Sequence, residues 1–196
     1  QSLTIRAADG QRPIVLLARP LAFRPVDAGA ATIAAPVVRL EGLYLAPDAT
    51  VFPAGEALVT RAAVARLEIV GCTLAPGGHE RRDGTRAPTQ PALHLTNDYG
   101  FTVPADVSAF VPTPDLVFQR TICGPIAVDE RYRLDLADCI VDAGRGAGDA
   151  PGAPLAIGPT GDPATDWAAA LDFAGLTCFG AVRVAEGRGF GGVFVQ

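Results

Sequence analysis

Residues 38–47 read Val-Arg-Leu-Glu-Gly-Leu-Tyr-Leu-Ala-Pro, and residues 67–76 read Leu-Glu-Ile-Val-Gly-Cys-Thr-Leu-Ala-Pro. The two stretches place apolar residues alike and share their Gly, their eighth-position Leu and the closing Ala-Pro. Three further copies of the pattern begin at Leu116, Leu134 and Leu171. An internal repeat decides the architecture before any other signal, because each copy is one structural unit that stacks on the next.

The copies carry apolar residues at their first, third, sixth and eighth positions, with Thr121 as the polar exception at one sixth position. Each pair alternates with period two, which indicates a short strand with one buried face. The phase breaks at the fifth position, and this position is occupied by Gly42, Gly71, Arg120, Asp138 and Gly175. Gly adopts positive φ freely, and Asp does so more readily than most residues. The chain therefore turns a corner at this position while both strands keep their apolar side inward.

The spacing of the copies agrees with stacked coils. Leu116 and Leu134 are 18 residues apart, about the minimum for a coil of three strands, and a third strand is expected at 124–128. A similar third strand is expected at 181–184. The longer separations, 29, 49 and 37 residues, contain Pro/Gly-rich inserts such as 75–91 and 143–166. Inserts of this kind belong on the outside of a solenoid, where they leave the stacking intact.

The sequence therefore predicts an all-β fold, a single right-handed parallel β-helix of about six coils with loop inserts, extending as one domain over residues 1–196. A β-sandwich also has many short strands, but it does not repeat a two-strand unit with a corner at a fixed position. A leucine-rich repeat would show an Asn or Cys ladder at a regular period of about 20–29 residues, with helical segments.

The pattern apolar-x-apolar-x-x-Cys/Ser-apolar-apolar of 134–141, and the opening at 3–13, resemble right-handed parallel β-helix proteins of the pectate-lyase-like type. They also resemble large bacterial proteins from GC-rich genomes that carry such β-helices, some of them associated with phage-tail-like systems. The resemblance implies the fold. It leaves the function open, because the same fold serves pectin-degrading enzymes, phage tailspikes and adhesins.

The bulk composition excludes two classes of partner. The net charge of −5 argues against nucleic acid, whose partners carry a basic face. No stretch approaches the roughly 18 apolar residues of a membrane span. The chain has no Met, and Gln1 leads directly into a strand-like run. We therefore expect a module of a longer protein, with an extracellular or particle-associated location.

The four cysteines occupy inward positions of the repeat: Cys72 and Cys139 the sixth, Cys123 and Cys178 the eighth. A buried Cys behaves as a small hydrophobic residue, and the pattern favours free structural thiols over a disulfide. The sequence contains no C-x-x-C pair, and neither His has metal-site spacing to a Cys. No metal and no cofactor are expected.

Acidic residues offer the only candidates for catalysis. Asp135 and Asp172 occupy the outward second position, and Asp138 lies on the same coil as Asp135. Polysaccharide-cleaving enzymes use paired carboxylates on an exposed face, so the alternative hypothesis is a polysaccharide lyase or hydrolase. Outward positions of a sheet are expected to be polar in any case, and no catalytic residue is assigned.

The inserts carry the candidate binding residues. Tyr99, Phe101 and Trp167 supply aromatic rings that can stack on sugars, and Arg81 and Arg82 supply charge for acidic groups. The preferred hypothesis is a non-catalytic structural or glycan/partner-binding module of a larger surface or phage-tail-like particle protein. The open ends, including the apolar run 193–195, are expected to contact other copies or the rest of the parent protein.

Overall fold

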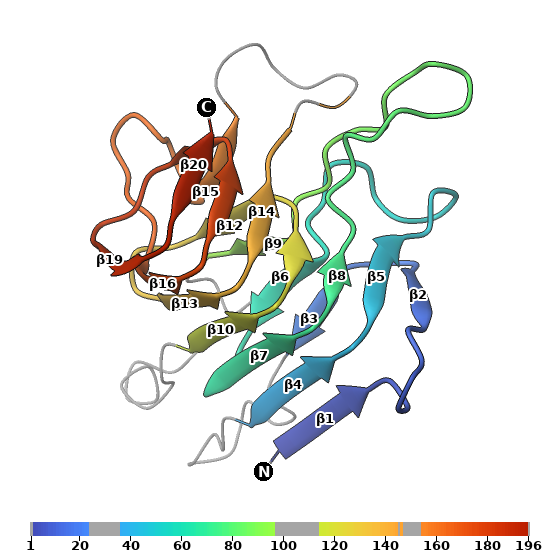
Figure 1. Cartoon of the computed structure of the whole chain (residues 1–196), viewed down its shortest axis with the longest axis horizontal. Coiled ribbons are helices and arrows are strands. Elements are labelled where there is room, and N and C mark those ends of the chain that lie inside the picture. The colour runs from blue at the N-terminus through green and yellow to red at the C-terminus, as the bar shows by residue number, and fades with distance from the viewer. Residues whose placement is uncertain (1, 24–35, 97–113, 145, 147–153, 196) are drawn as a thin grey trace, which may run out of the picture.

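The computed structural model describes residues 2–23, 36–96, 114–144, 146 and 154–195. Within these residues it consists of strands, turns and loops, with no helix (Figure 1). The strands form three sheets in which every pair of neighbouring strands is parallel. The predicted all-β parallel β-helix is thereby confirmed.

The first sheet contains β1 (Ser2–Arg6), β4 (Val37–Glu41), β7 (Arg66–Val70), β10 (Asp115–Gln119), β13 (Arg133–Ala137), β16 (Ala170–Ala174) and β19 (Gly187–Phe190). The second contains β2 (Ile14–Leu17), β5 (Tyr44–Pro47), β8 (Thr73–Leu74), β11 (Ile122–Cys123), β14 (Ile140–Asp142), β17 (Thr177–Phe179) and β20 (Val193–Val195). The third contains β3 (Leu21–Phe23), β6 (Val59–Ala62), β9 (Leu93–Leu95), β12 (Ile126–Val128), β15 (Leu155–Gly158) and β18 (Ala181–Val182).

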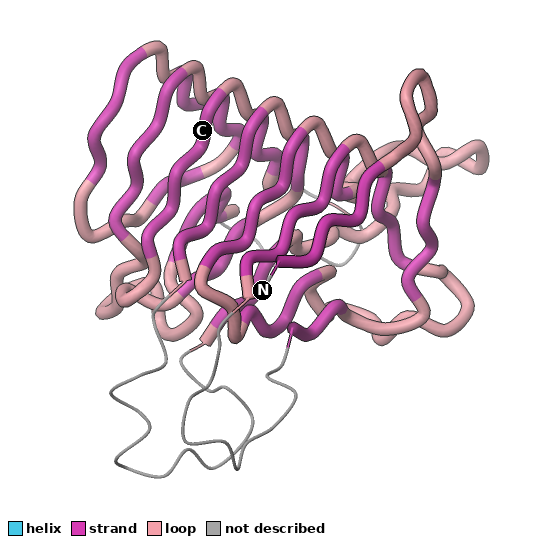
Figure 2. Tube along the Cα trace, turned by 90° about the horizontal axis from the view of Figure 1, so that it is seen from below, coloured by secondary structure: helices cyan, strands magenta, loops and turns pink. Residues whose placement is uncertain are grey.

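Each coil takes one strand from each sheet in chain order. The first coil is β1-β2-β3, the sixth is β16-β17-β18, and β19-β20 begin a seventh. Figure 2 shows the coils as successive rungs of parallel strands. The predicted third strands at 124–128 and 181–184 are found as β12 and β18.

The register of the first sheet reproduces the repeat read from the sequence. Val38 pairs with Leu67, Leu67 with Leu116, Leu116 with Leu134, and Leu134 with Leu171. These five residues are the first positions of the five copies. A shift by one residue would turn every apolar side chain outward, so burial of one face fixes this alignment.

The corner between the first and second sheets has the backbone conformation that the repeat requires. All five predicted corner residues have positive φ, and Arg120 (49°) and Asp138 (53°) adopt it without being glycine. Gly191, with φ of 66°, makes the same corner in the seventh coil. The left-handed conformation is therefore a property of the position, and glycine is the residue that adopts it with least strain.

The interior is a continuous apolar stack. The first, third, sixth and eighth positions of the copies at 38, 67, 116 and 134 are all buried. The four cysteines lie in this stack as free, buried thiols, as predicted. Thr121 is the buried polar residue among the described positions, and its hydroxyl lies 3.1 Å from the carbonyl oxygen of Ile69 and 3.0 Å from that of Gln119.

The remaining two corners carry the inserts. Residues 48–58 and 75–92 connect the second sheet to the third, and the latter form the hairpin with bridges Gly77–Thr89 and Glu80–Arg86. Residues 129–132 and 159–169 connect the third sheet back to the first. Inserts from consecutive coils therefore lie side by side along two separate edges of the solenoid.

Candidate functional site

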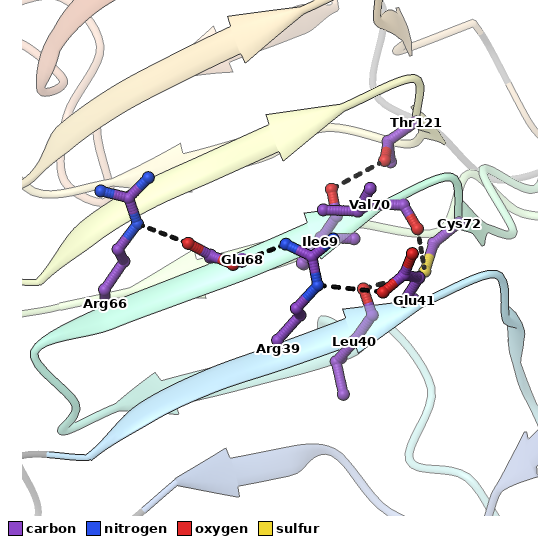
Figure 3. Close-up of polar contacts among 9 residues, drawn as sticks. All are labelled: Arg39, Leu40, Glu41, Arg66, Glu68, Ile69, Val70, Cys72 and Thr121. Atoms are coloured by element: carbon purple, nitrogen blue, oxygen red, sulfur yellow. Dashed lines mark hydrogen bonds and ion pairs between the residues drawn. The ribbon is translucent and has the colours of Figure 1, made fainter. Parts of the chain in front are cut away.

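The outer face of the first sheet is charged. Arg66 Nε donates to Glu68 Oε1 at 2.7 Å, and Arg39 Nη1 donates to Glu68 Oε2 at 2.8 Å. Arg39 Nε also donates to Glu41 Oε2 at 3.0 Å, so the network connects β4 to β7 (Figure 3). Hydrogen bonds from Arg39 hold the pKa of Glu68 below its usual value. Every charge in this group has a partner, and the arrangement connects two coils without leaving a reactive group.

The candidate acids lie further along the same face. Asp135 and Asp172 are direct neighbours in register across β13 and β16. Arg133 Nη2 donates to Asp172 Oδ2 at 2.8 Å, and Arg188 follows Asp172 in the next strand. Asp138 occupies the corner with positive φ and does not belong to this column. The structure therefore brings together two of the three acids and places the third elsewhere.

This acidic pair lacks the surroundings of a catalytic dyad. Asp135 is exposed, and the side chain of Asp172 retains 37% of its accessible surface. A general acid is usually kept protonated by an apolar pocket or by an unpaired like charge. Here the carboxylate of Asp172 is held in an ion pair by Arg133, and no apolar pocket encloses it.

Trp167 lines a polar cleft at the edge where the third sheet turns into the first. The cleft has a volume of about 320 Å³ and lies between the turn 129–131 and the insert around 159–167. Its lining residues are Asp129, Glu130, Arg131, Pro159, Thr160, Gly161, Thr165, Asp166 and Trp167. Carboxylates, hydroxyls and one guanidinium therefore surround a single indole ring.

The indole ring is supported from one side. The guanidinium carbon of Arg183 lies 4.2 Å from the ring centroid of Trp167. Arg183 is itself held by its hydrogen bonds to the carbonyl oxygens of Asp166 (2.6 Å) and Ala164 (3.1 Å). Trp167 remains 49% exposed. A ring stacked on a fixed cation is oriented before any ligand arrives.

A larger, mainly apolar cleft lies at a different edge, where the second sheet turns into the third, between the loop after β5 and the hairpin after β8. Its volume is about 690 Å³. The apolar lining residues are mostly Ala, Pro and Gly, together with Phe52 and the ring of Tyr44. Polar side chains are contributed by Asp48, His79, Arg81, Thr89 and Gln90. The two clefts therefore differ in chemistry as well as in position.

Hydrogen bonds fix both walls of the apolar cleft. The Asp48 carboxylate accepts from the backbone N and the hydroxyl of Thr50, at 2.9 and 2.7 Å. At the tip of the hairpin, Asp83 accepts in the same way from Thr85. Gln90 Nε2 donates to the carbonyl oxygen of Glu56 at 2.6 Å, which joins the base of the hairpin to the loop. The cleft is therefore preformed.

The predicted binding residues separate into three groups. Arg81 lines the apolar cleft, whereas Arg82, its neighbour in the same hairpin, does not. Trp167 lines the polar cleft at another edge. Tyr99 and Phe101 lie outside the described residues. The inserts do not all converge on one site, because they leave the coil at two different corners.

Several residues that line the two clefts were not predicted from the sequence, among them Phe52 and the turn at 129–131. The spacing of the coils is the sequence signal that could have identified these residues. Inserts at the same corner of adjacent coils lie beside each other, so the loop after 47 and the insert after 76 are neighbours although the chain separates them by a full coil.

Among the described residues no group of three His, Cys, Asp or Glu side chains is arranged to hold a metal ion. The same residues include no helix of the length and apolarity that a membrane crossing requires. Comparison with known proteins gives no match to a family model, to a curated protein sequence or to a solved structure.

Proposed function

We propose that this chain is a non-catalytic structural and glycan-binding β-helix module of a larger surface or phage-tail-like particle protein. The observation that supports glycan binding best is Trp167, an oriented and half-exposed indole in a polar cleft. Sugar rings present apolar C–H faces to aromatic rings and hydroxyls to polar groups, so recognition needs both kinds of surface together.

The charges in the cleft favour one class of sugar. Asp129, Glu130 and Asp166 outnumber Arg131, and their carboxylates accept hydrogen bonds from hydroxyl or amino groups. Uronic acids would place a further negative charge beside them, and like charges repel. Neutral sugars and amino sugars are therefore the proposed ligands of this cleft.

The test is a binding and cleavage assay with a panel of neutral, amino-containing and acidic polysaccharides. We expect binding without chain cleavage, and we expect Trp167→Ala to weaken it by about tenfold, the loss of one aromatic stacking contact of about 1.4 kcal/mol. Phe179→Ala is the matched control, because Phe179 is a similarly exposed aromatic residue outside the cleft. Equal losses in both variants, or no binding to any polysaccharide, would contradict the proposal.

A second candidate function, polysaccharide cleavage, draws on the direct register of Asp135 and Asp172. If the acidic face were catalytic, Asp135→Asn and Asp172→Asn would each abolish cleavage while leaving binding at the Trp167 cleft intact. We expect no cleavage by the unmodified chain, because the mechanism needs two free carboxylates and Arg133 holds that of Asp172 in an ion pair.

A further inference from the structure

The apolar cleft has little capacity to bind a sugar. Three of its polar side chains are already engaged: Asp48 with Thr50, Thr89 with the carbonyl oxygen of Gly144, and Gln90 with that of Glu56. The floor consists of Ala and Pro residues whose side chains offer no hydrogen-bonding group. A polyhydroxylated ligand would lose its hydration there without replacement, which is costly.

The hairpin wall of the cleft carries a positive charge, whereas the Asp48 carboxylate on the facing loop is held by Thr50. Arg81 lies on the hairpin wall, and among the described residues no ion pair to its guanidinium is found within salt-bridge distance. The carboxylate of Asp83 makes its hydrogen bonds with Thr85 and interacts with Arg81 only electrostatically, at longer range. His79 lines the same wall. The cleft thus combines an apolar floor with a cationic wall.

The apolar surface continues beyond the cleft. Ile14 and Leu16 of β2 are in register with Tyr44 and Ala46 of β5, which line the cleft. They point to the same outer face of the second sheet and are 69% and 61% exposed. Contiguous exposed apolar surface of this kind marks interaction sites on soluble proteins. An occupant that uses both regions must carry several apolar groups along an extended chain.

From these observations we propose that the cleft between the loop 48–55 and the hairpin 77–89 binds an extended polypeptide segment bearing apolar side chains and a carboxylate. The apolar side chains pack on the Ala/Pro floor between Tyr44 and Phe52, and the carboxylate accepts hydrogen bonds from the Arg81 guanidinium. The proposal does not depend on the glycan proposal, since the two clefts share no residue.

The experiment uses an array of synthetic peptides of about eight residues, a length of roughly 27 Å when extended. Alternate positions carry Leu, Phe or Val, and the others carry Glu, Gln or Lys. The affinities of the best peptides are then measured in solution by fluorescence anisotropy. We expect Glu-containing peptides to bind and their Lys counterparts not to bind.

Two pairs of variants make the test specific. Arg81→Ala is expected to weaken Glu-peptide binding by about tenfold, the loss of a charge-assisted hydrogen bond. Arg82→Ala, at the adjacent residue but outside the cleft, is expected to leave binding unchanged. Ala54→Arg fills the cleft and abolishes binding, whereas Val51→Arg, on an exposed part of the same loop, does not.

The proposal is overturned if no peptide binds, if Lys peptides bind as well as Glu peptides, or if the two arginine variants lose affinity equally. Oligosaccharide binding that Ala54→Arg abolishes while Trp167→Ala leaves it intact would also overturn it, because the cleft would then be a sugar site. Loss of glycan binding in Trp167→Ala with unchanged peptide binding would separate the two sites.

Discussion

The Oδ1 atom of Asp138 lies 2.7 Å from the point where a Cβ atom on Gly175 would be placed. The two residues occupy the same corner in consecutive coils, and both have positive φ, 53° and 67°. The side chain of Asp138 in one coil therefore fills the space that the absent Cβ of Gly175 leaves in the next coil. The corners are coupled along the stack, so a substitution at one of them depends on its neighbour.

Gly175→Ala is expected to destabilise the protein by more than Gly71→Ala. Both changes place a side chain on a left-handed residue, which costs about 1–2 kcal/mol. Only Gly175 adds the contact with Asp138, since a Cβ on Gly71 would meet open space. Urea unfolding of both variants measures the difference, and the double variant Asp138→Gly/Gly175→Ala should restore part of the loss. Equal losses in the two single variants would contradict this coupling.

Phe118→Ala is expected to lower the free energy of unfolding by about 3–5 kcal/mol, the range for a fully buried phenylalanine. Phe118 has no exposed surface and lies in the middle coil, where it packs between Ile69 and Leu136 of the neighbouring strands. Phe179→Ala, at a position that is 41% exposed, should cost far less. Thermal and urea unfolding of both variants test whether the interior is one continuous core.

Glu68→Gln should weaken the connection between β4 and β7. The carboxylate bridges Arg39 and Arg66, and partly exposed ion pairs of this kind contribute about 1 kcal/mol or less. Because the pKa of Glu68 is lowered in the folded state, its contribution is present above its ordinary value of 4.5 and is lost as the pH falls through the folded value. The difference between wild type and variant should therefore shrink in acid and in high salt. A difference that stays constant from pH 7 to pH 3 would show that the ion pairs contribute nothing.

Burial raises the pKa of the Cys139 thiol to about 11 and that of Cys178 to about 12. The folded state keeps both thiols protonated, while the unfolded chain releases their protons near pH 9. The contribution of these thiols to the free energy of unfolding is therefore fully present below pH 9, and it declines as the pH rises towards their pKa values in the folded state. Each thiol contributes up to about 1.4 kcal/mol per pH unit in that window.

Cys139→Ala should make the free energy of unfolding fall less steeply between pH 9 and 10.5, as measured by urea unfolding. Val141→Ala is the control, because it removes core volume from the same coil without removing a titrating group. Parallel pH profiles in the two variants would contradict the assigned role of burial. In the same protein, the four thiols should react with a thiol reagent only as fast as the chain unfolds, since all four are buried.

Much of the fold could be predicted from local pattern. The repeat at 38–47 and 67–76 places an apolar residue at each inward position, and the residue types at the fifth position identify the corner. The one exception, Arg120, also has positive φ, because stacking between Gly71 and Asp138 imposes the conformation on it. Strand register followed directly, since only one alignment buries all the inward side chains.

The candidate sites were predicted less completely. Trp167 and Arg81 were identified as insert residues, yet they belong to different clefts, and Phe52 was not identified at all. A pattern of apolar residues reports on which side chains are buried, but it says little about which loops face each other. Asp135 and Asp172 were placed correctly in one column, whereas the ion pair of Asp172 with Arg133 is a contact between side chains that no spacing reveals.

The sequence by itself determined the coil: two short strands, a left-handed corner and an inward apolar stack, because each of these depends on residues within a few positions of one another. The tertiary structure decided where the inserts lie and what chemistry they enclose. Only stacking brings the loop after β5 against the hairpin after β8, and Asp129 against Trp167. A cleft is formed by residues from different coils, so its shape and charge arise when the coils pack.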